Sequence, residues 1–404
     1  MQIWNAWGLK FSSEALQLEG RILPPPTLFF GQNYEERINR AEWSRPAANK
    51  QMLAPIALEK WAIVYNKKTA EQAFRNFKDG IRECAKKIGV PLKPPKTIEI
   101  YDDRTDSLIK NLREIPKDCE LVLAIFSGPM RTDKYSALKK ICCIEKPMPS
   151  QVILQKTLTK SKNIQSVLSK VLLQMATKGG GEPWGVKIPP LPGLMVMSIH
   201  EAKSFTTLVS TVNDTFSRFS SLVWDHKIKE GSVRSLFNKA IEAYKSNNGN
   251  ENPKSVIIFS NGAVKSEWKE DFPDETDVAL IMVKTNTILK MMQLTDWRKG
   301  EYANPPAGTV VDHKVTSEND FYLVPMNVNL GTVTPTHFVV VDQGSFEANH
   351  IQEVAYALTH MYFNWTGTVK VPATSQYALK LSDLVTQHLH SAPDQSLSST
   401  LFYL

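Results

Sequence analysis

The sequence has few cysteines and no long apolar run. Its four cysteines include no CxxC pair and no nearby histidine at zinc-site spacing, which argues against a disulfide framework or a zinc finger. Apolar runs such as residues 194–197 and 256–259 have the length of strands and are too short to span a bilayer. No apolar signal segment follows Met1. We therefore expect no membrane partner, reduced thiols, and an intracellular protein that is cytoplasmic or nuclear.

Charge of either sign is only mildly unbalanced. The 404 residues contain 48 Lys and Arg against 41 Asp and Glu, which gives a formal net charge of +7. A hydrophobic content of 42% is ordinary for a globular protein, and this length allows two or three domains. The basic balance suits a polyanionic partner but does not require one, because many basic proteins bind no nucleic acid.

Local patterns divide the chain into three parts. Residues 1–90 are irregular apart from a helix expected at 70–88, and they have too few apolar runs for an independent core, so we interpret them as a linker segment that packs on the rest. Strands and helices alternate in residues 91–182, which predicts an α/β domain with a mainly parallel sheet. A second α/β domain is expected over residues 183–404, ending on two helices.

Five polar residues in the middle part could surround one anion. Tyr135 and Lys139 stand four apart on one expected helix, and Gln174 and Lys178 stand four apart at the end of another. Gln151 follows a proline-rich turn between them. Two ammonium groups, a phenol and two amides supply the donors that a terminal phosphate needs. The spacing alone also fits ordinary solvated helix faces, so this interpretation needs further support.

Longer motifs around these residues resemble the MID domain of Argonaute proteins. The runs are YSALKKICC at residues 135–143, PSQ at 149–151 and LQMATKGG at 173–180. The paired cysteines, the PSQ and the glutamine four before lysine resemble the PIWI branch of that family. The likeness covers about residues 91–404 and closes on LFYL at 401–404, and residues 20–31 resemble the linker that precedes MID.

The resemblance implies a fold and a set of ligands. The fold is a Rossmann-like MID domain followed by a ribonuclease H-like PIWI domain, preceded by the linker. Tyr135, Lys139, Gln151, Gln174 and Lys178 would bind the 5′-phosphate of a guide RNA. Gln174 and the carboxylate of Leu404 would hold Mg²⁺ against the guide phosphates, a suitable pair of hard ligands. Tyr377 and Lys380 would contact the guide backbone. Ala176 departs from the asparagine that relatives often carry.

The same resemblance implies a cutting site that this chain lacks in part. Slicers of the family hold two metals with Asp, Glu, Asp and His, because negative oxygens must offset two close cations. The corresponding positions here are read as His200, Glu230, Asn261 and His337, with Lys227 as a competitor of Glu230. At most one carboxylate remains, so we expect no catalytic metal pair and no enzyme activity.

The function expected from the resemblance is a non-cutting reader of RNA. The chain would be a monomer that holds a piRNA-like guide, pairs it with a complementary target RNA and recruits silencing-effector proteins. Two alternatives stay open: a slicer with altered metal preference, since a His/His/Glu cluster can hold one zinc or manganese ion, and an interaction scaffold that binds no RNA. A Rossmann nucleotide enzyme is excluded because no GxGxxG follows the first strand expected in the middle part.

Overall fold

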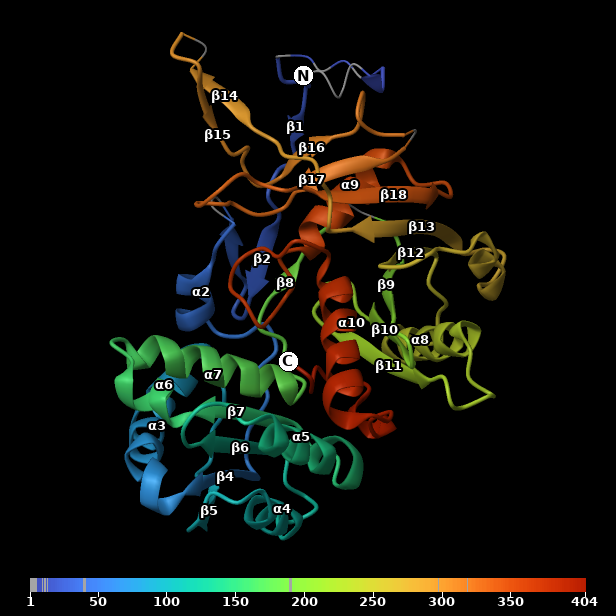
Figure 1. Cartoon of the computed structure of the whole chain (residues 1–404). Coiled ribbons are helices and arrows are strands. Elements are labelled where there is room, and N and C mark those ends of the chain that lie inside the picture. The colour runs from blue at the N-terminus through green and yellow to red at the C-terminus, as the bar shows by residue number, and fades with distance from the viewer. Residues whose placement is uncertain are drawn as a thin grey trace.

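The protein consists of two α/β lobes. The computed structural model describes residues 6–8, 10, 12, 14–38, 41–188, 191–296, 298–317 and 319–404. One lobe is built on a four-stranded sheet and the other on a nine-stranded sheet, and the C-terminus lies between them (Figure 1). The expected α/β class is therefore confirmed.

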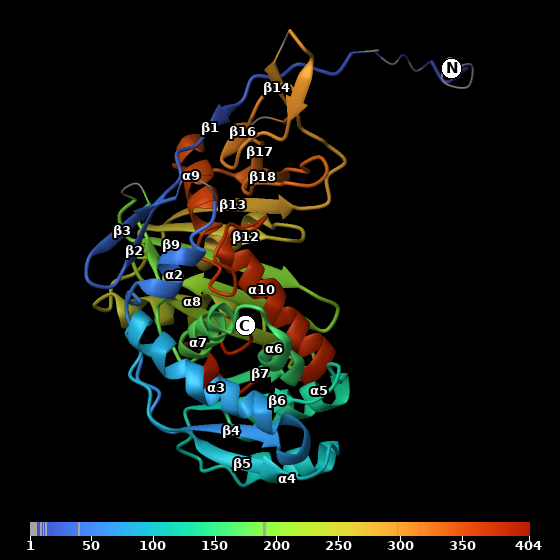
Figure 2. The ribbon, with the colours of Figure 1, turned by 90° about the vertical axis from the view of Figure 1, so that its left-hand side faces the viewer.

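The smaller lobe contains a fully parallel sheet. Its strands, in spatial order, are β5 (Lys96–Ile100), β4 (Trp61–Asn66), β6 (Leu121–Phe126) and β7 (Ser150–Leu154). Alternate residues of β4 and β6 point to opposite faces and are buried on both, as expected for a parallel sheet between helix layers. One face is covered by α3 (Lys67–Ile88), α6 (Gln155–Lys160) and α7 (Ile164–Lys178), and the other by α4 (Thr105–Arg113) and α5 (Thr132–Lys140) (Figure 2).

The first domain begins earlier than residue 91. Strand β4 lies between β5 and β6 in the sheet, so the predicted boundary would remove a central strand together with α3. The predicted helix at 70–88 is present as α3, and its apolar face, which includes Phe74, Phe77 and Ile81, packs into the core of this lobe. Only part of residues 1–90 is therefore a linker.

The larger sheet is mixed. Its spatial order is β1 (Arg21–Ile22), β16 (Thr309–Val311), β17 (Phe321–Val324), β18 (Thr336–Asp342), β13 (Asp277–Lys284), β12 (Ser255–Ser260), β9 (Leu194–Glu201), β10 (Phe205–Thr211) and β11 (Phe219–Asp225). Strands β9, β12 and β13 are parallel, so their carboxyl ends share one edge, where the antiparallel β18 begins. Helices α9 (Ala348–Leu358) and α10 (Ala373–Leu384) contribute to the core on one face, and α8 (Val233–Asn247) with η2 (Ser266–Asp271) covers the other.

Smaller elements complete the chain. They are the sheet of β3 (Tyr34–Arg37), β2 (Thr27–Phe30) and β8 (Gly185–Val186), the hairpin β14 (Gln293–Asp296) and β15 (Glu301–Ala303), helix α2 (Ser44–Asn49), and the short helices η1 (Ile141–Glu145), η3 (Val385–Leu389) and η4 (Gln395–Leu397). Among the described residues, every helix is too short or too polar to cross a membrane.

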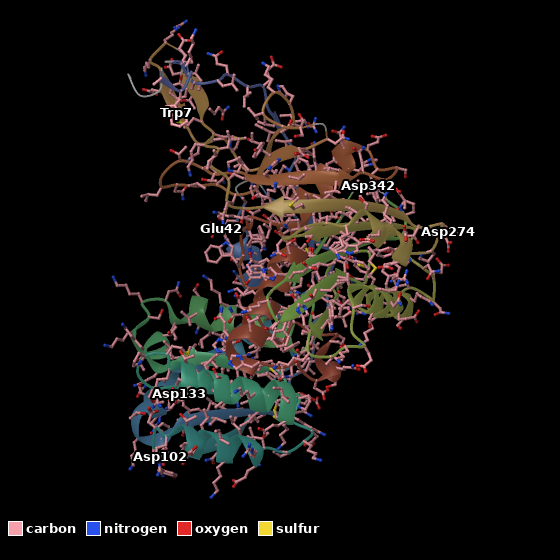
Figure 3. The ribbon with its side chains drawn as sticks, turned by 45° about the vertical axis from the view of Figure 1, so that its right-hand side comes forward. Trp7, Glu42, Asp102, Asp133, Asp274 and Asp342 are labelled. Atoms are coloured by element: carbon pink, nitrogen blue, oxygen red, sulfur yellow. The ribbon has the colours of Figure 1, made fainter. Side chains whose placement is uncertain are left out.

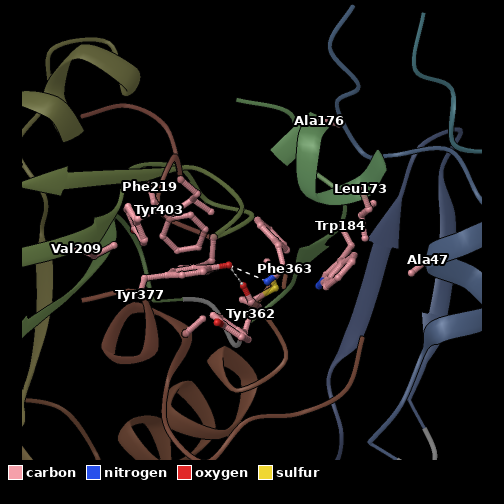
Figure 4. Close-up of a cluster of buried hydrophobic side chains, with 14 of the residues drawn as sticks. Ala47, Leu173, Ala176, Trp184, Val209, Phe219, Tyr362, Phe363, Tyr377 and Tyr403 are labelled. Carbon is pink, nitrogen blue, oxygen red and sulfur yellow. Dashed lines mark hydrogen bonds between the residues drawn. The ribbon is translucent and has the colours of Figure 1, made fainter. Parts of the chain in front are cut away.

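The N-terminal segment ties the two lobes together. Glu42 forms an isolated bridge with Gly367, and it lies between the lower and upper lobes in Figure 3. The buried cluster in Figure 4 joins Ala47 of α2 and Leu173 of α7 to Trp184 and Phe363. One core therefore runs from the linker through α7 into the larger lobe.

Candidate functional site

The five predicted anion-binding residues lie together at the junction of the lobes. From α5, the Lys139 side chain reaches inward and is only 1% exposed. Its Nζ lies 5.6 Å from the centre of the Tyr135 ring and donates to the carbonyl oxygens of Ser150 at 3.3 Å and Phe402 at 3.5 Å. The four-residue spacing of Tyr135 and Lys139 thus places both on one side of α5, as expected. The cluster of the five residues is called the pocket below.

Helix α7 supplies the opposite wall. Lys178, 2% exposed, donates from Nζ to the carbonyl oxygen of Ser150 at 3.0 Å and to Oε1 of Gln151 at 2.7 Å. The Gln151 amide donates in turn to Oε1 of Gln174 at 3.0 Å. The chain of hydrogen bonds continues into the larger lobe, where the Gln174 amide donates to Oδ1 of Asn364 at 2.5 Å.

The pocket holds two buried lysine side chains without a carboxylate partner among the described residues. Among the described residues, neither Lys139 nor Lys178 forms an ion pair; both contact only neutral oxygens. Burial lowers the pKa of Lys178 well below its usual value, and the charge of Lys139 lowers it further. Because a charged lysine is costly to bury without a partner, an anion bound here would stabilise the charged form of Lys178.

The C-terminal tail forms one side of the same pocket. Phe402 and Tyr403 are buried, and the Tyr403 hydroxyl lies 3.0 Å from Oγ of Ser221. This anchoring fixes Leu404 next to the carbonyl oxygen that Lys139 contacts. The Leu404 carboxylate and Oε1 of Gln174 are oxygens of the kind that Mg²⁺ prefers, and their role as Mg²⁺ ligands stays a prediction.

One contact to this wall could not be expected from the motifs. His388, in η3, packs edge-on against Tyr135 with ring centres 4.7 Å apart, and its Nδ1 lies 2.9 Å from Oγ of Ser136. Burial lowers the pKa of His388, with the charge of Lys139 as a second cause. Neither His388 nor Asn364 has a sequence signal of its own, since each reaches the pocket from the other lobe.

The two residues predicted to contact a guide backbone differ in outcome. Tyr377 is 0% exposed, and its hydroxyl donates to the carbonyl oxygen of Met361 at 2.7 Å and accepts from the backbone N–H of Phe363 at 2.8 Å (Figure 4). The prediction is wrong for Tyr377, which closes a buried turn. Lys380 is partly exposed on α10, and its role stays a prediction.

His200 and Asn261, two of the four residues predicted at the metal site, lie side by side. His200 is the second-to-last residue of β9, and Asn261 follows β12, the adjacent parallel strand. The Asn261 backbone N–H donates to the carbonyl oxygen of Ile199 at 3.3 Å. Oδ1 of Asn261 accepts from the backbone N–H of Glu201 at 3.2 Å. Nδ1 of His200 is buried and has no hydrogen-bond partner in the described part of the chain. Burial lowers the pKa of His200.

The other two positions do not join them. Glu230 is exposed in the loop before α8. His337 lies on β18, three strand steps from β9, or about 14 Å at the usual spacing between strands. There it stacks on Tyr322 and its Nε2 lies 3.2 Å from Oδ2 of Asp320. The prediction of one four-residue cluster is therefore wrong for His337. Helix α10, which carries Asp383, packs against β9.

Carboxylates do lie near this sheet edge, since Glu201 follows His200 on β9 and Asp383 is close enough to His200 to act on its pKa. Burial is the main cause of the lowered pKa of His337. Across the described residues, no group of three or more His, Cys, Asp or Glu side chains is arranged to hold a metal ion. At this edge the structure therefore places His200 and Asn261 side by side, with Glu201 next to them; the expected absence of a catalytic metal pair stays a prediction.

The chain combines a parallel α/β lobe, a mixed-sheet lobe and a cationic pocket between them. This is the architecture of the MID and PIWI domains together. A family model described as Piwi domain matches residues 121–390, and one described as Mid domain of argonaute matches residues 46–118. The first match covers more than half of the chain, so the chain belongs to the Piwi-type Argonaute family. The second spans β4 and α3, in agreement with the early start of the first domain.

Known relatives agree with this assignment. The chain is 32% identical over 431 residues to "Piwi-like protein 1" of Danio rerio, and 33% identical over 425 residues to "Protein argonaute-3" of Drosophila melanogaster. These alignments cover 99% and 100% of this chain but 49% of each relative. The chain thus spans about half the length of the curated relatives it matches.

Solved structures share the fold. The crystal structure of Drosophila Piwi matches with a TM-score of 0.86 and 25% identity, covering 100% of this chain and 59% of that one. The C-terminal lobe of a budding yeast Argonaute matches with a TM-score of 0.76 and 19% identity over 95% of both chains. The expected fold, a MID domain followed by a PIWI domain, is confirmed.

Proposed function

We propose that this chain binds the 5′-phosphorylated end of a small, piRNA-like guide RNA and presents it to a complementary target for RNA silencing without cutting that target. The observation that carries the proposal is the pair of buried lysines, Lys139 and Lys178, which meet at one backbone carbonyl and lack a carboxylate partner in the described residues. A terminal phosphate would supply the missing negative charge through charge-assisted hydrogen bonds.

Each wall of the pocket would have a distinct task. Lys139 and Lys178 would neutralise the phosphate, while the amides of Gln151 and Gln174 would orient it. The partly exposed Tyr135 ring, held edge-on by His388, would receive the first base. Gln174 and the Leu404 carboxylate would hold Mg²⁺, which when bound neutralises neighbouring guide phosphates.

The absence of cutting is proposed from the sheet edge. A two-metal nuclease needs several carboxylates that converge on one point, whereas His200 and Asn261 are neutral and Glu230 is on the surface. Silencing would then rely on effector proteins recruited by a monomeric guide complex. A relative whose structure was solved "with a guide RNA", an Argonaute of Kluyveromyces polysporus, supports the guide-binding part by its shared fold.

The test compares one short RNA with a 5′-phosphate and with a 5′-hydroxyl, in Mg²⁺. We expect the wild-type protein to prefer the phosphate, and Lys139→Ala or Lys178→Ala to lower that preference about tenfold to a hundredfold, the value of a hydrogen bond to a charged group. Lys140→Ala is the matched control, since it removes an exposed lysine next to Lys139.

Two results would contradict the proposal. Equal binding of both RNAs by the wild-type protein would rule out the phosphate pocket and favour a scaffold. Cleavage of a complementary target in Mg²⁺ or Mn²⁺ would rule out the non-cutting part while leaving guide binding intact.

A further inference from the structure

One face of α7 leads out of the pocket. Lys178, Gln174 and Lys170 stand four residues apart and therefore line up along the helix. Lys178 lies inside the pocket, and Gln174 contacts Asn364 at its rim. Lys170 lies two helical turns from Lys178, a distance of about 12 Å along the axis. This face connects the buried pocket to the surface.

An exposed tryptophan stands at the outer end of this face. Trp365 directly follows Asn364 and is 53% exposed. Nζ of Lys170 lies over its ring, 5.7 Å from the ring centre. A large aromatic side chain left in water beside a cation is a recurrent platform for single-stranded nucleic acid, because every base can stack on it.

The indole is held in place by the loop around it. A Cβ added at Gly367 would lie 2.5 Å from Nε1 of Trp365, so glycine is what allows the ring to fold back on its own loop. The Trp365 backbone N–H donates to Tyr362 at 3.1 Å. The loop is also clamped by the linker, since the Trp43 backbone N–H donates to the carbonyl oxygen of Thr366 at 2.9 Å. Such a preformed surface loses little entropy when it binds.

We propose that Trp365 and Lys170 form a second contact site for the same strand, where a base near the 5′ end stacks on the indole and Lys170 contacts the adjoining phosphate. This inference rests on the proposed function, because the strand must first be anchored in the pocket. At the stacked spacing of about 3.4 Å per nucleotide, 12 Å of helix corresponds to about three nucleotides. The site is therefore reached by the third or fourth nucleotide of the guide.

Affinity measured against strand length tests this site. The probes are 5′-phosphorylated RNAs, from the mononucleotide through the dinucleotide and tetranucleotide to the hexanucleotide. We expect the wild-type affinity to rise between the dinucleotide and the tetranucleotide. Trp365→Ala should remove on the order of tenfold in affinity for the tetranucleotide and hexanucleotide while binding the mononucleotide as wild type does. Trp365→Phe should retain most of the gain.

Two further variants complete the design. Lys170→Ala should lower the affinity for the longer strands and reduce their salt dependence, because one phosphate contact is lost. Trp7→Ala is the matched control: Trp7 is 78% exposed and lies at the far end of the molecule from α7 (Figure 3), so its removal should change none of the affinities. Thermal unfolding of each variant shows whether the fold is intact.

Each contrary outcome has its own meaning. If Trp365→Ala binds every length as wild type does, the stacking site is overturned and the indole belongs to a surface that faces protein. If it weakens the mononucleotide equally, its role is to support the loop. If the wild-type protein shows no preference for a 5′-phosphate, the proposed function fails and this inference fails with it.

Discussion

At the scale of single residues, the protein keeps two lysine side chains close together in its interior, although burial disfavours their charged forms. The two lysines of the pocket share one carbonyl acceptor, Ser150, and are both buried. Replacement of such buried charges by apolar groups of similar size is often neutral or stabilising. Their presence is therefore better explained by a ligand than by the stability of the fold.

Residue-level prediction succeeded where sequence spacing and spatial proximity coincide. Tyr135, Lys139, Gln174 and Lys178 were placed correctly on shared helix faces because an interval of four residues is a local geometric rule. The placement of His337 beside His200 is wrong because the motif around His337 carries no information on strand order. In the sheet, β18 lies three strands from β9. Tyr377 was misread because a tyrosine on an amphipathic helix can turn either inward or outward.

The altered metal positions make a prediction about single side chains. His200→Asp combined with Asn261→Asp would place two carboxylates on adjacent parallel strands, about 5 Å apart. Such a pair offers the hard oxygen ligands that divalent cations prefer. We expect the double variant to bind Mn²⁺ measurably more tightly than wild type, as seen by isothermal titration calorimetry.

The control for this experiment is Glu230→Ala. Glu230 is exposed, so its removal should leave Mn²⁺ binding by the double variant unchanged. An equal Mn²⁺ affinity of wild type and double variant would show that these two strand ends do not converge on one site.

At the scale of elements, the smaller lobe depends on the junction of β4 and α3. The strand was missed from the sequence because its six residues, WAIVYN, carry no period-two pattern, as is usual when both faces are buried. The following helix was predicted because its apolar residues recur on one face. The boundary error therefore came from the element whose sequence pattern is least specific.

Both ends of α3 are capped, which gives a prediction about stability. Oδ1 of Asn66 accepts from the backbone N–H groups of Lys68 and Thr69 at 2.9 and 3.2 Å, and Gly89 ends the helix with φ of 75°. Asn66→Ala should cost about 1 kcal/mol of unfolding free energy, and Gly89→Ala about 1 kcal/mol because alanine is strained there. Chemical denaturation measures both.

The matching control is Asn49→Ala. Asn49 is the last residue of α2, and its exposed side chain donates to the carbonyl oxygen of Arg45 at 2.8 Å, so its loss should have a small effect. Destabilisation by Asn66→Ala no larger than that of Asn49→Ala would contradict the capping role.

At the scale of the whole molecule, a buried histidine joins segments far apart in sequence. His360 is fully buried; its ring stacks on Trp43 at 5.4 Å, and its carbonyl oxygen accepts from Nε1 of Trp184 at 2.9 Å. The linker and the residue just before β8 thus meet the turn after α9 at His360. Nε2 of His360 has no hydrogen-bond partner among the described residues. The charged form of this ring is therefore poorly accommodated.

The lowered pKa of His360 predicts how the stability of the folded protein changes in acid. Burial lowers the pKa of His360 from 6.5 to about 4. Above pH 6.5 the ring is neutral in both the folded and unfolded states. As the pH falls from 6.5 towards 4, His360 binds a proton in the unfolded chain but not in the folded protein. The free energy of unfolding therefore decreases across that window. Between pH 7 and 5 the loss from this group is about 2 kcal/mol.

The measurement is the free energy of unfolding by urea at several pH values from 7 down to 5, above the range where most carboxylates titrate. His360→Phe removes the titrating group while retaining an aromatic ring against Trp43, so it should flatten the slope by about 2 kcal/mol over this range. If His360→Phe retains the full slope instead, acid sensitivity arises elsewhere and His360 is not the group that couples the joined segments to pH.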